Sequence, residues 1–373
     1  MTLQVGFLGY RFMGEAHASA LARLPMFFPE APQTERRVLV GQDEAALADA
    51  ADRLGFAETA TDWEAAVDRC DVLYNLGPNF LHVDPSIAAL EADVHVLCEK
   101  PLAPTLEDAE RMRDAAATSD ALAACAFNYR FVPAIRYAKG LIDDGELGAI
   151  RHVRGRYYQD WLVDPTEPWS WRLDEELAGS GALGDLGAHT VDLARFLVGE
   201  IAEVSGHLWT FVDERPAPGA DGSDDADATR EVTVDDAYTA QAAFENGATG
   251  TFEASRVAPG HKNDQVIEIL GTDGSLRFSL ERLNELDVKR PGSRGYETVL
   301  VTDEEDPYVD RWWPPGHVLG WEHTFVHENF EFLSAVDAGS EFQPSFAEGL
   351  ATQRVLDAVA RSDETGEWIT VES

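Results

Sequence analysis

The first residues of the chain combine an apolar run with a glycine turn. An apolar run over residues 3–8 leads into a turn in which Gly9 and Gly14 take the outer positions of a G-x-G-x-x-G pattern, with Arg11 at the middle position. A helix that begins here would offer free N–H groups and its positive dipole end to a pyrophosphate. The pattern therefore predicts a dinucleotide site, with a purely structural turn as the alternative. The side chains inside the turn are Tyr10, Arg11, Phe12 and Met13.

The residues that should select the adenosine ribose of such a cofactor depart from the usual pattern. An acidic residue normally lies near the end of the second strand and binds the ribose hydroxyls. Here Gly41 stands where the acid is expected, Gln42 follows it, and Asp43 comes two positions late. Arg11 could instead meet a 2′-phosphate or cover the adenine. The sequence therefore leaves NAD and NADP both open.

A lysine suited to catalysis follows a buried strand. The segment Glu99-Lys100-Pro101 comes directly after the apolar residues 94–98. Carboxyl ends of strands face the ligand crevice in doubly wound sheets, and Lys100 is one of only four lysines against 25 arginines. Its ammonium group would hydrogen-bond a substrate oxygen and stabilise developing alkoxide charge. Pro101 would fix the turn, with a cis bond as one way to do so. A solvated lysine at the start of a helix is the alternative.

A third group combines a carboxylate with a histidine. Asp185 and His189 are spaced i, i+4, which places them on one face of a helix predicted over residues 182–197. A histidine beside a carboxylate is a good general acid–base pair near neutral pH. Four glycines precede or accompany the pair, which suits close approach to a flat ligand. A metal site would need more ligands, and a capped helix with a core histidine is the alternative.

The elements that must position these groups fall into two patterns. Over residues 1–128, strand-like and helix-like segments alternate, which predicts parallel βαβ units in a doubly wound sheet. The predicted strands are residues 3–8, 38–40, 72–76, 94–98 and 122–127. The predicted helices are residues 14–24, 44–54, 62–68, 85–91 and 106–118.

From residue 129 to residue 373 the pattern changes to an α+β domain. After a helix over residues 132–143, strand candidates follow one another with hairpin-type turns, which predicts a largely antiparallel open sheet. These strands are residues 151–159, 203–211, 238–244, 249–254, 266–270 and 275–280. Residues 213–230 are rich in Pro, Gly, Asp and Ser and are predicted to be a surface loop, and helices over residues 323–338 and 346–362 follow at the end.

The overall charge excludes several classes of partner. With 68 acidic and 29 basic residues the formal net charge is −39, which argues against binding nucleic acid or an anionic membrane surface. Few lysines among many carboxylates suit a folded protein at high salt, where screening removes self-repulsion. Cys70, Cys98 and Cys125 show no metal-ligand spacing and are expected in the core. With neither a leader pattern nor an apolar run of membrane length, a cytoplasmic location is expected.

Taken together, the three groups resemble the Gfo/Idh/MocA oxidoreductase family, over nearly the whole chain. The glycine turn, Glu99-Lys100-Pro101 and the segment from Gly184 to His189 occur in that family's order and spacing. Pro78, Asn79 and His82 resemble its cofactor-side loop, and residues 128–131 resemble its domain junction. Residues 158–161, 171–172 and 320–323 resemble a branch that acts on cyclitols, such as inositol, and on sugars.

The resemblance implies an NAD- or NADP-dependent dehydrogenase of a sugar or polyol, with no metal, that self-associates as a dimer or tetramer through its open sheet. Lys100, Asp185 and His189 would be catalytic. The cofactor-binding residues would be Gly9, Tyr10, Arg11, Phe12, Met13, Gly14, Gln42, Pro78, Asn79, His82, Glu99 and Lys100. The substrate-binding residues would be Lys100, Tyr129, Arg130, Trp161, Trp171, Arg172, Asp185, His189 and His323. A glycosidase with tightly bound NAD and a non-catalytic dinucleotide sensor are the alternatives.

Overall fold

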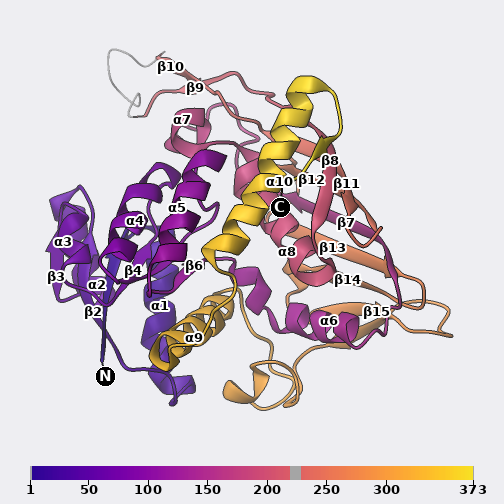
Figure 1. Ribbon diagram of the computed structural model, residues 1–373, viewed down its shortest axis with the longest axis horizontal. Helices are drawn as coiled ribbons and strands as arrows, with labels where there is room; N and C mark the ends of the chain where they lie inside the picture. The colour runs from indigo at the N-terminus through magenta and orange to yellow at the C-terminus, as the bar shows by residue number, and fades with distance from the viewer. Residues whose placement is uncertain (1, 219–227, 373) are drawn as a thin grey trace. The chain divides into compact units, whose positions relative to one another are not determined.

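The computed structural model describes residues 2–218 and 228–372, which form two compact units (Figure 1). The first unit comprises Met1–Val132 and Tyr308–Leu350, and the second comprises Pro133–Pro307 and Ala351–Ser373. The predicted single boundary after residue 128 did not include this return of the chain to the first unit. The sequence pattern of a single helix could not show this return to the first unit, because the return depends on contacts between segments that are far apart in the sequence.

The first unit contains a six-stranded parallel sheet in the order β3-β2-β1-β4-β5-β6. The predicted doubly wound sheet is therefore confirmed, with one short strand, β3, that was not predicted. The order reverses between β1 and β4, and such a switch point is where ligands bind in folds of this kind. The strands are β1 (Leu3–Leu8), β2 (Thr34–Val40), β3 (Glu58–Ala60), β4 (Val72–Asn75), β5 (His95–Cys98) and β6 (Ala123–Cys125).

Helices connect these strands, as parallel pairing requires. The helix α2 is amphipathic and begins at an aspartate cap, while α5 begins at a threonine cap. Each cap satisfies backbone N–H groups that the first helical turn leaves open. The helices are α1 (Phe12–Phe27), α2 (Glu44–Leu54), α3 (Glu64–Val67), α4 (Val83–Glu91) and α5 (Leu106–Thr118), with a 3-10 turn η1 (Asn79–Leu81) before α4 and another, η2 (Asn128–Phe131), after β6.

The returning segment adds a further helix to the first unit. The helix α9 (Glu322–Ala338) packs against α1 and η2 (Figure 1). Its buried phenylalanines, Phe325 and Phe332, join Phe7 of β1 and Phe28 in one apolar core. The sheet and the returning helix therefore share one core, and a polar side chain on the inner face of α9 is buried within the first unit.

The second unit contains a nine-stranded sheet in the order β16-β15-β14-β13-β7-β12-β11-β8-β17. The predicted, largely antiparallel sheet is confirmed, since β7 and β12 are the parallel pair and the other neighbours run antiparallel. The strands β15, β16 and β17 were not predicted. The strands are β7 (Ile150–Tyr158), β8 (Ile201–Trp209), β11 (Ala237–Phe244), β12 (Thr249–Ser255), β13 (Asp264–Gly271), β14 (Ser275–Ser279), β15 (Glu285–Lys289), β16 (Glu297–Leu300) and β17 (Ile369–Thr370).

One face of this sheet is covered and the other is open. In β11, Tyr238 and Ala240 are buried while Thr239 and Gln241 between them are exposed, as the alternation of side chains along a strand dictates. The helices of this unit are α6 (Pro133–Asp143), α7 (Glu175–Ala178) and α8 (Ala188–Val198), and it also contains the 3-10 turns η3 (Trp171–Leu173) and η5 (Leu280–Arg282). Among the helices of the second unit, α6 and α8 contact strands of this sheet. A further 3-10 turn, η6 (Val309–Arg311), belongs to the first unit. The last helix, α10 (Phe346–Thr365), runs from the first unit into the second.

Two predictions about this unit were wrong in detail. The predicted helix over residues 182–197 is a π-helix, Leu183–Gly187, followed by α8. The predicted loop over residues 213–230 contains the short strands β9 (Glu214–Pro216) and β10 (Thr229–Glu231), which pair antiparallel; residues 219–227 lie outside the described part. Within residues 2–218 and 228–372, no helix is both long and apolar enough to span a bilayer.

Candidate active site

The turn between β1 and α1 depends on its two glycines. Gly9 has a φ of +106°, and a Cβ there would lie 2.7 Å from the carbonyl oxygen of Leu76. A Cβ on Gly14 would lie 2.7 Å from the carbonyl oxygen of Gly9. Arg11, which precedes α1, supplies no side-chain cap and is exposed. The first N–H groups of α1 are therefore open to an external acceptor, which fits the pyrophosphate of a dinucleotide.

The end of β2 offers no carboxylate that is ready to bind a ribose. The ring of Tyr10 covers Gly41 so closely that a Cβ on Gly41 would lie 2.2 Å from the Tyr10 ring. The Asp43 carboxylate accepts the N–H groups of Ala45 and Ala46, each at 3.1 Å, and so caps α2. Gln42 donates its amide to the carbonyl of Thr61 at 2.9 Å. The Asp43 carboxylate is thus already used as the cap of α2.

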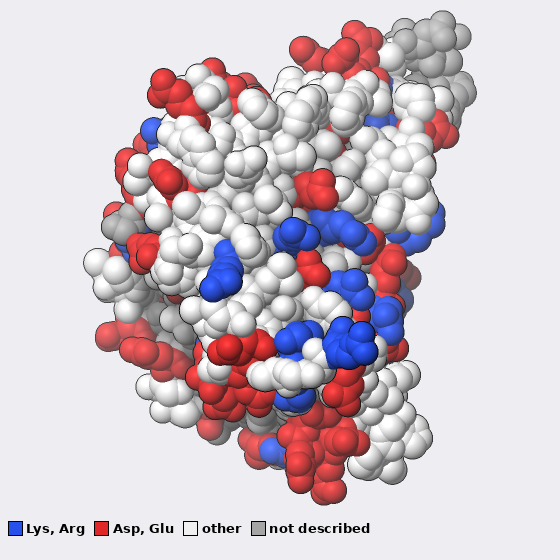
Figure 2. Space-filling model, turned by 90° about the vertical axis from the view of Figure 1, so that its right-hand side faces the viewer, with Lys and Arg blue, Asp and Glu red and all other residues white. Residues whose placement is uncertain are grey.

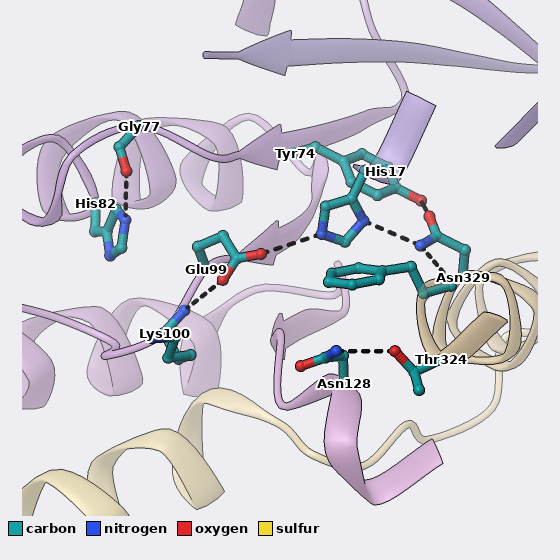
Figure 3. Close-up of polar contacts among 10 residues, drawn as sticks. His17, Tyr74, Gly77, His82, Glu99, Lys100, Asn128, Thr324 and Asn329 are labelled. Carbon is teal, nitrogen blue, oxygen red and sulfur yellow. Dashed lines mark hydrogen bonds and ion pairs between the residues drawn. The ribbon is translucent and has the colours of Figure 1, made fainter. Parts of the chain in front are cut away.

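Buried side chains hold the loop after β4 through contacts with backbone carbonyl groups. Buried Asn75 donates to the carbonyls of Leu81 and His82, at 2.9 and 3.1 Å. His82, expected on the cofactor side, is fully buried, and its Nδ1 lies 2.9 Å from the carbonyl oxygen of Pro101. Its Nε2 lies 3.1 Å from the carbonyl oxygen of Gly77, the contact drawn in Figure 3. Burial lowers the pKa of His82. His82 therefore links the loop that begins at Gly77 to the peptide after Lys100. In the same loop, Pro78 is half-buried and Asn79 is buried.

The end of β5 places Glu99 and Lys100 at the carboxyl edge of the parallel sheet. The Lys100–Pro101 bond is cis. Glu99 is only 6% exposed, its N–H donates to the carbonyl of Asn75 at 2.9 Å, and its carboxylate accepts the Lys100 backbone N–H at 3.2 Å. Lys100 itself is half-buried. The cysteine Cys98 just before them is buried, and burial raises the pKa of its thiol, as suits a core residue.

Three further buried polar residues form a series of contacts that ends at Glu99, and sequence reasoning did not select them as functional. His17 of α1 lies with Nε2 at 3.2 Å from Glu99 Oε1 and Nδ1 at 3.0 Å from Asn329 Nδ2 of α9 (Figure 3). The Tyr74 hydroxyl of β4 donates to Asn329 Oδ1 at 2.6 Å. Burial raises the pKa of Tyr74, so its hydroxyl stays protonated as a donor. The signal that could have found them is a polar residue at a core position of each element.

The second unit carries the other predicted catalytic residues. Asp185 is half-buried in the π-helix, and His189 is 6% exposed in the first turn of α8. The predicted i, i+4 pair on a continuous α-helix was therefore wrong, since Asp185 lies in a wider π turn, a feature often found at functional sites. The His189 ring lies 6.0 Å from that of Tyr157, centroid to centroid.

A buried aspartate anchors the start of this helix. The Asp235 carboxylate accepts the N–H groups of Gly181 and Leu183 at 2.7 and 2.8 Å, and its backbone carbonyl accepts Ala182 N–H at 3.0 Å. Burial raises the pKa of Asp235, whereas Arg256 and these N–H groups lower it. A Cβ on Gly181 would lie 1.7 Å from the Asp235 carbonyl oxygen. The expectation that these glycines admit a flat ligand was thus wrong for Gly181, which admits the protein backbone.

The predicted substrate residues of the first unit are mostly committed to the fold. Arg130 is buried and donates to Glu348 at 3.0 Å, and the Tyr129 hydroxyl lies 3.4 Å from the Trp321 indole nitrogen. His323 Nδ1 accepts the N–H of Gly320 at 3.0 Å, which orients its ring, and burial lowers its pKa. These three side chains therefore support local structure in the returning segment and η2.

The predicted substrate residues of the second unit gather around Arg256. Its guanidinium donates to the carbonyls of Asp235 and Arg172, at 2.8 and 3.3 Å, and lies 6.0 Å from the centre of the Trp161 ring. Trp161 is 41% exposed, and the Arg172 guanidinium lies over the Trp171 ring at 4.5 Å. Exposed aromatic faces beside arginines suit a ring that carries several hydroxyl groups.

The chain matches known proteins over both of its units. Residues 3–127 match the family described as "Oxidoreductase family, NAD-binding Rossmann fold", and residues 135–277 match the "GFO/IDH/MocA C-terminal domain". Levoglucosan dehydrogenase of Pseudarthrobacter phenanthrenivorans is 40% identical over 99% of this chain and 98% of its own.

Two solved structures are similar over their whole length. An oxidoreductase domain protein from Kribbella flavida superimposes with a TM-score of 0.95 and 45% identity, covering 100% of both chains. A levoglucosan dehydrogenase in complex with NADH and levoglucosan does so with a TM-score of 0.95 and 39% identity, again covering 100% of both chains.

Proposed function

This chain belongs to the Gfo/Idh/MocA oxidoreductase family, and we propose that it transfers hydride between nicotinamide and a hydroxyl-bearing carbon of a sugar or cyclitol. The observation that carries the proposal is the end of β5, where Glu99 is held beside Lys100 at the edge of the sheet that binds ligands in this fold. The relative crystallised with NADH and levoglucosan supports a cyclic sugar as the substrate class. Levoglucosan is the first compound to test, and inositol the second.

The proposed mechanism divides the reaction between proton and hydride. A bound nicotinamide would supply the hydride acceptor for the substrate carbon. His189 takes the proton from the reacting hydroxyl as a general base. Lys100 hydrogen-bonds the same oxygen and stabilises the negative charge that develops on it. Asp185 orients the substrate or the histidine, and Trp161, Trp171 and Arg172 contact the sugar ring.

The direct test measures cofactor binding and turnover together. Saturating NAD or NADP should stabilise the fold by about 3 kcal/mol, seen as a rise in Tm of several degrees. Levoglucosan, inositol and common aldoses are then assayed for reduction of added cofactor. Failure of both cofactors to raise Tm would contradict the proposal. Cofactor that copurifies, together with no net reduction of added NAD, would instead favour transient oxidation by a glycosidase.

We also propose that both cofactors are accepted and that Arg11 binds the 2′-phosphate of NADP. Gly41 and the committed Asp43 leave no ready carboxylate to repel that phosphate, and exposed Arg11 stands beside the turn. Arg11→Ala should raise KM for NADP about tenfold and change KM for NAD less than about twofold. Arg53→Ala is the control, because Arg53 is an exposed arginine on α2 paired with Glu15. Equal effects of Arg11→Ala on both cofactors would contradict this role.

Self-association through the open face of the second sheet is part of the same proposal. That face has a hollow of about 600 Å³ whose lining includes Arg154, Arg156, Glu268 and Arg277. Figure 2 looks onto the side of the molecule that carries this sheet, and Lys and Arg side chains gather there on an otherwise acidic surface. A face with low negative charge is where two chains of net charge −39 repel each other least.

Light scattering in dilute buffer and in molar KCl tests the oligomeric state. It also tests the expectation from the acidic, lysine-poor composition that the protein is suited to high salt. We expect a dimer or tetramer that persists in molar KCl and dissociates in dilute buffer, because screening removes repulsion between the acidic chains. Arg154→Glu should favour the monomer, whereas Arg53→Glu, the same charge change on α2, should not. A wild-type monomer at all salt concentrations would contradict the interface. A cytoplasmic location is proposed as well, supported by three buried cysteines without a disulfide.

A further inference from the structure

The hydrogen bonds around Asn329 determine which way its side-chain amide points. Its Nδ2 lies 2.7 Å from the carbonyl oxygen of Phe325, which can only accept, so this atom is the NH₂ group. Its Oδ1 accepts the Tyr74 hydroxyl at 2.6 Å. The second hydrogen of the NH₂ group is therefore directed at His17 Nδ1, 3.0 Å away.

This orientation determines the tautomer of His17. Because Asn329 donates to Nδ1, that nitrogen must accept, and the ring proton lies on Nε2. Nε2 then donates to Glu99 Oε1 at 3.2 Å. A proton on Nδ1 would set two N–H donors face to face in a fully buried site.

Both oxygens of Glu99 thereby have a donor. Oε1 accepts His17 Nε2–H and Oε2 accepts the Lys100 backbone N–H, at 3.2 Å each. The terminal torsion of a glutamate is otherwise broad, so a single donor would leave the carboxylate free to rotate. Two donors from different elements hold its plane at the carboxyl edge of β5 (Figure 3).

We propose that His17 and Asn329 are positioning residues for the cofactor: Asn329 sets the His17 tautomer, and His17 orients the carboxylate of Glu99, a cofactor-binding residue implied by the family resemblance, beside Lys100. This inference rests on the proposed function, and it gives the returning segment, through α9, a part in cofactor binding. The proposed effect of His17 and Asn329 is on the geometry and affinity of the bound cofactor and not on proton transfer.

Two substitutions of His17 separate the two hydrogen bonds. In His17→Gln the amide nitrogen takes the place of Nε2 and keeps a donor for Glu99, whereas in His17→Asn the amide takes the place of Nδ1 and removes that donor. His17→Asn should raise the Kd for NADH and KM for the cofactor about tenfold, with kcat at saturating cofactor changed less than about twofold. His17→Gln should stay within about threefold of the wild-type Kd.

His327→Asn is the matched control. His327 is fully buried on α9, its Nδ1 donates to the carbonyl of Phe131 at 2.9 Å, and its Nε2 accepts the Trp312 indole N–H at 2.8 Å. His327→Asn replaces a fully buried histidine by asparagine, as His17→Asn does, but His327 does not contact Glu99. The Kd for NADH should therefore stay unchanged even if the fold is weakened. Equal increases in Kd for His17→Asn and His17→Gln would overturn the proposal.

The tautomers of His17 and His327 in the wild-type protein give a readout that depends neither on activity nor on the folding of a variant. In wild-type protein labelled with ¹⁵N-histidine, two-bond ¹H–¹⁵N spectra should show His17 protonated on Nε2 and His327 protonated on Nδ1. Asn329→Asp should move a proton onto Nδ1 of His17, because the carboxylate there accepts. A wild-type His17 protonated on Nδ1 would overturn the inference. Failure of the wild type to bind NAD or NADP would instead overturn the proposed function while this spectrum still tests the hydrogen-bond network.

Discussion

Lys100→Met should lower kcat for oxidation of the sugar hydroxyl by about 10³-fold, the loss that follows when a donor to a developing oxyanion is removed. The Kd for NADH should change far less than kcat. Glu99 is held by the backbone N–H of Lys100 and by His17, and both contacts survive the loss of the lysine side chain. The expected defect therefore lies in turnover and not in cofactor binding. Steady-state kinetics and NADH fluorescence titration measure the two quantities separately.

Lys139→Met is the matched control for this variant. Lys139 lies on α6, pairs with Asp143 one turn away and is another of the four lysines of the chain. Its replacement makes the same change in charge and should leave kcat within about twofold, as is usual for surface substitutions. If Lys100→Met kept kcat near that of the wild type, the lysine would be a solvated residue in a turn, and the proposed catalytic role would be wrong.

Local patterns were enough to predict the first sheet and the glycine turn. The strands β1, β4 and β5 are short apolar runs that end at glycine or polar residues, and α2 and α5 have both amphipathic spacing and cap residues. These signals arise within about ten residues of chain, which is why their bounds agree closely with the structure. The turn at Gly9 belongs to the same class, because its φ of +106° is a property of one residue.

The buried network around Glu99 could not be predicted in the same way. Asn329 and His17 are 312 residues apart in sequence, and nothing in the helical spacing of α9 shows that it packs on α1. Both side chains are fully buried in their helices, where a polar residue is an exception that only tertiary contacts explain. The role of Asn329 depends on the return of residues 308–350 to the first unit, and that return is a property of the whole fold.

The glycines before His189 show a different limit. Close approach by another group was the correct physical inference for Gly181, but a sequence does not say whether that group is a ligand or the protein's own backbone. The structure places the carbonyl of Asp235 there, because that residue also accepts the N–H groups of Gly181, Ala182 and Leu183. The aspartate lies more than 50 residues further along the chain, two residues before β11.

Gly181→Ala should therefore be among the most damaging single-methyl changes in the second unit. The new Cβ would lie 1.7 Å from the Asp235 carbonyl oxygen and 2.5 Å from Arg256 Nη2, so the backbone must move and the contacts to Asp235 must lengthen. We expect a loss of about 3 kcal/mol or more in the free energy of unfolding, from overpacking and from buried N–H groups left without an acceptor. Because the same contacts anchor the helix that carries Asp185 and His189, kcat should fall as well.

Gly140→Ala makes the test specific to steric contact. Gly140 lies exposed within α6, and a Cβ there would meet nothing within 4 Å. Alanine favours a helix over glycine, so this variant should be about 0.5–1 kcal/mol more stable than the wild type. The same added methyl group should thus change stability in opposite directions at the two positions. Urea unfolding of both variants measures the difference, and a Gly181→Ala protein as stable as the wild type would show that Asp235 does not hold the start of this helix.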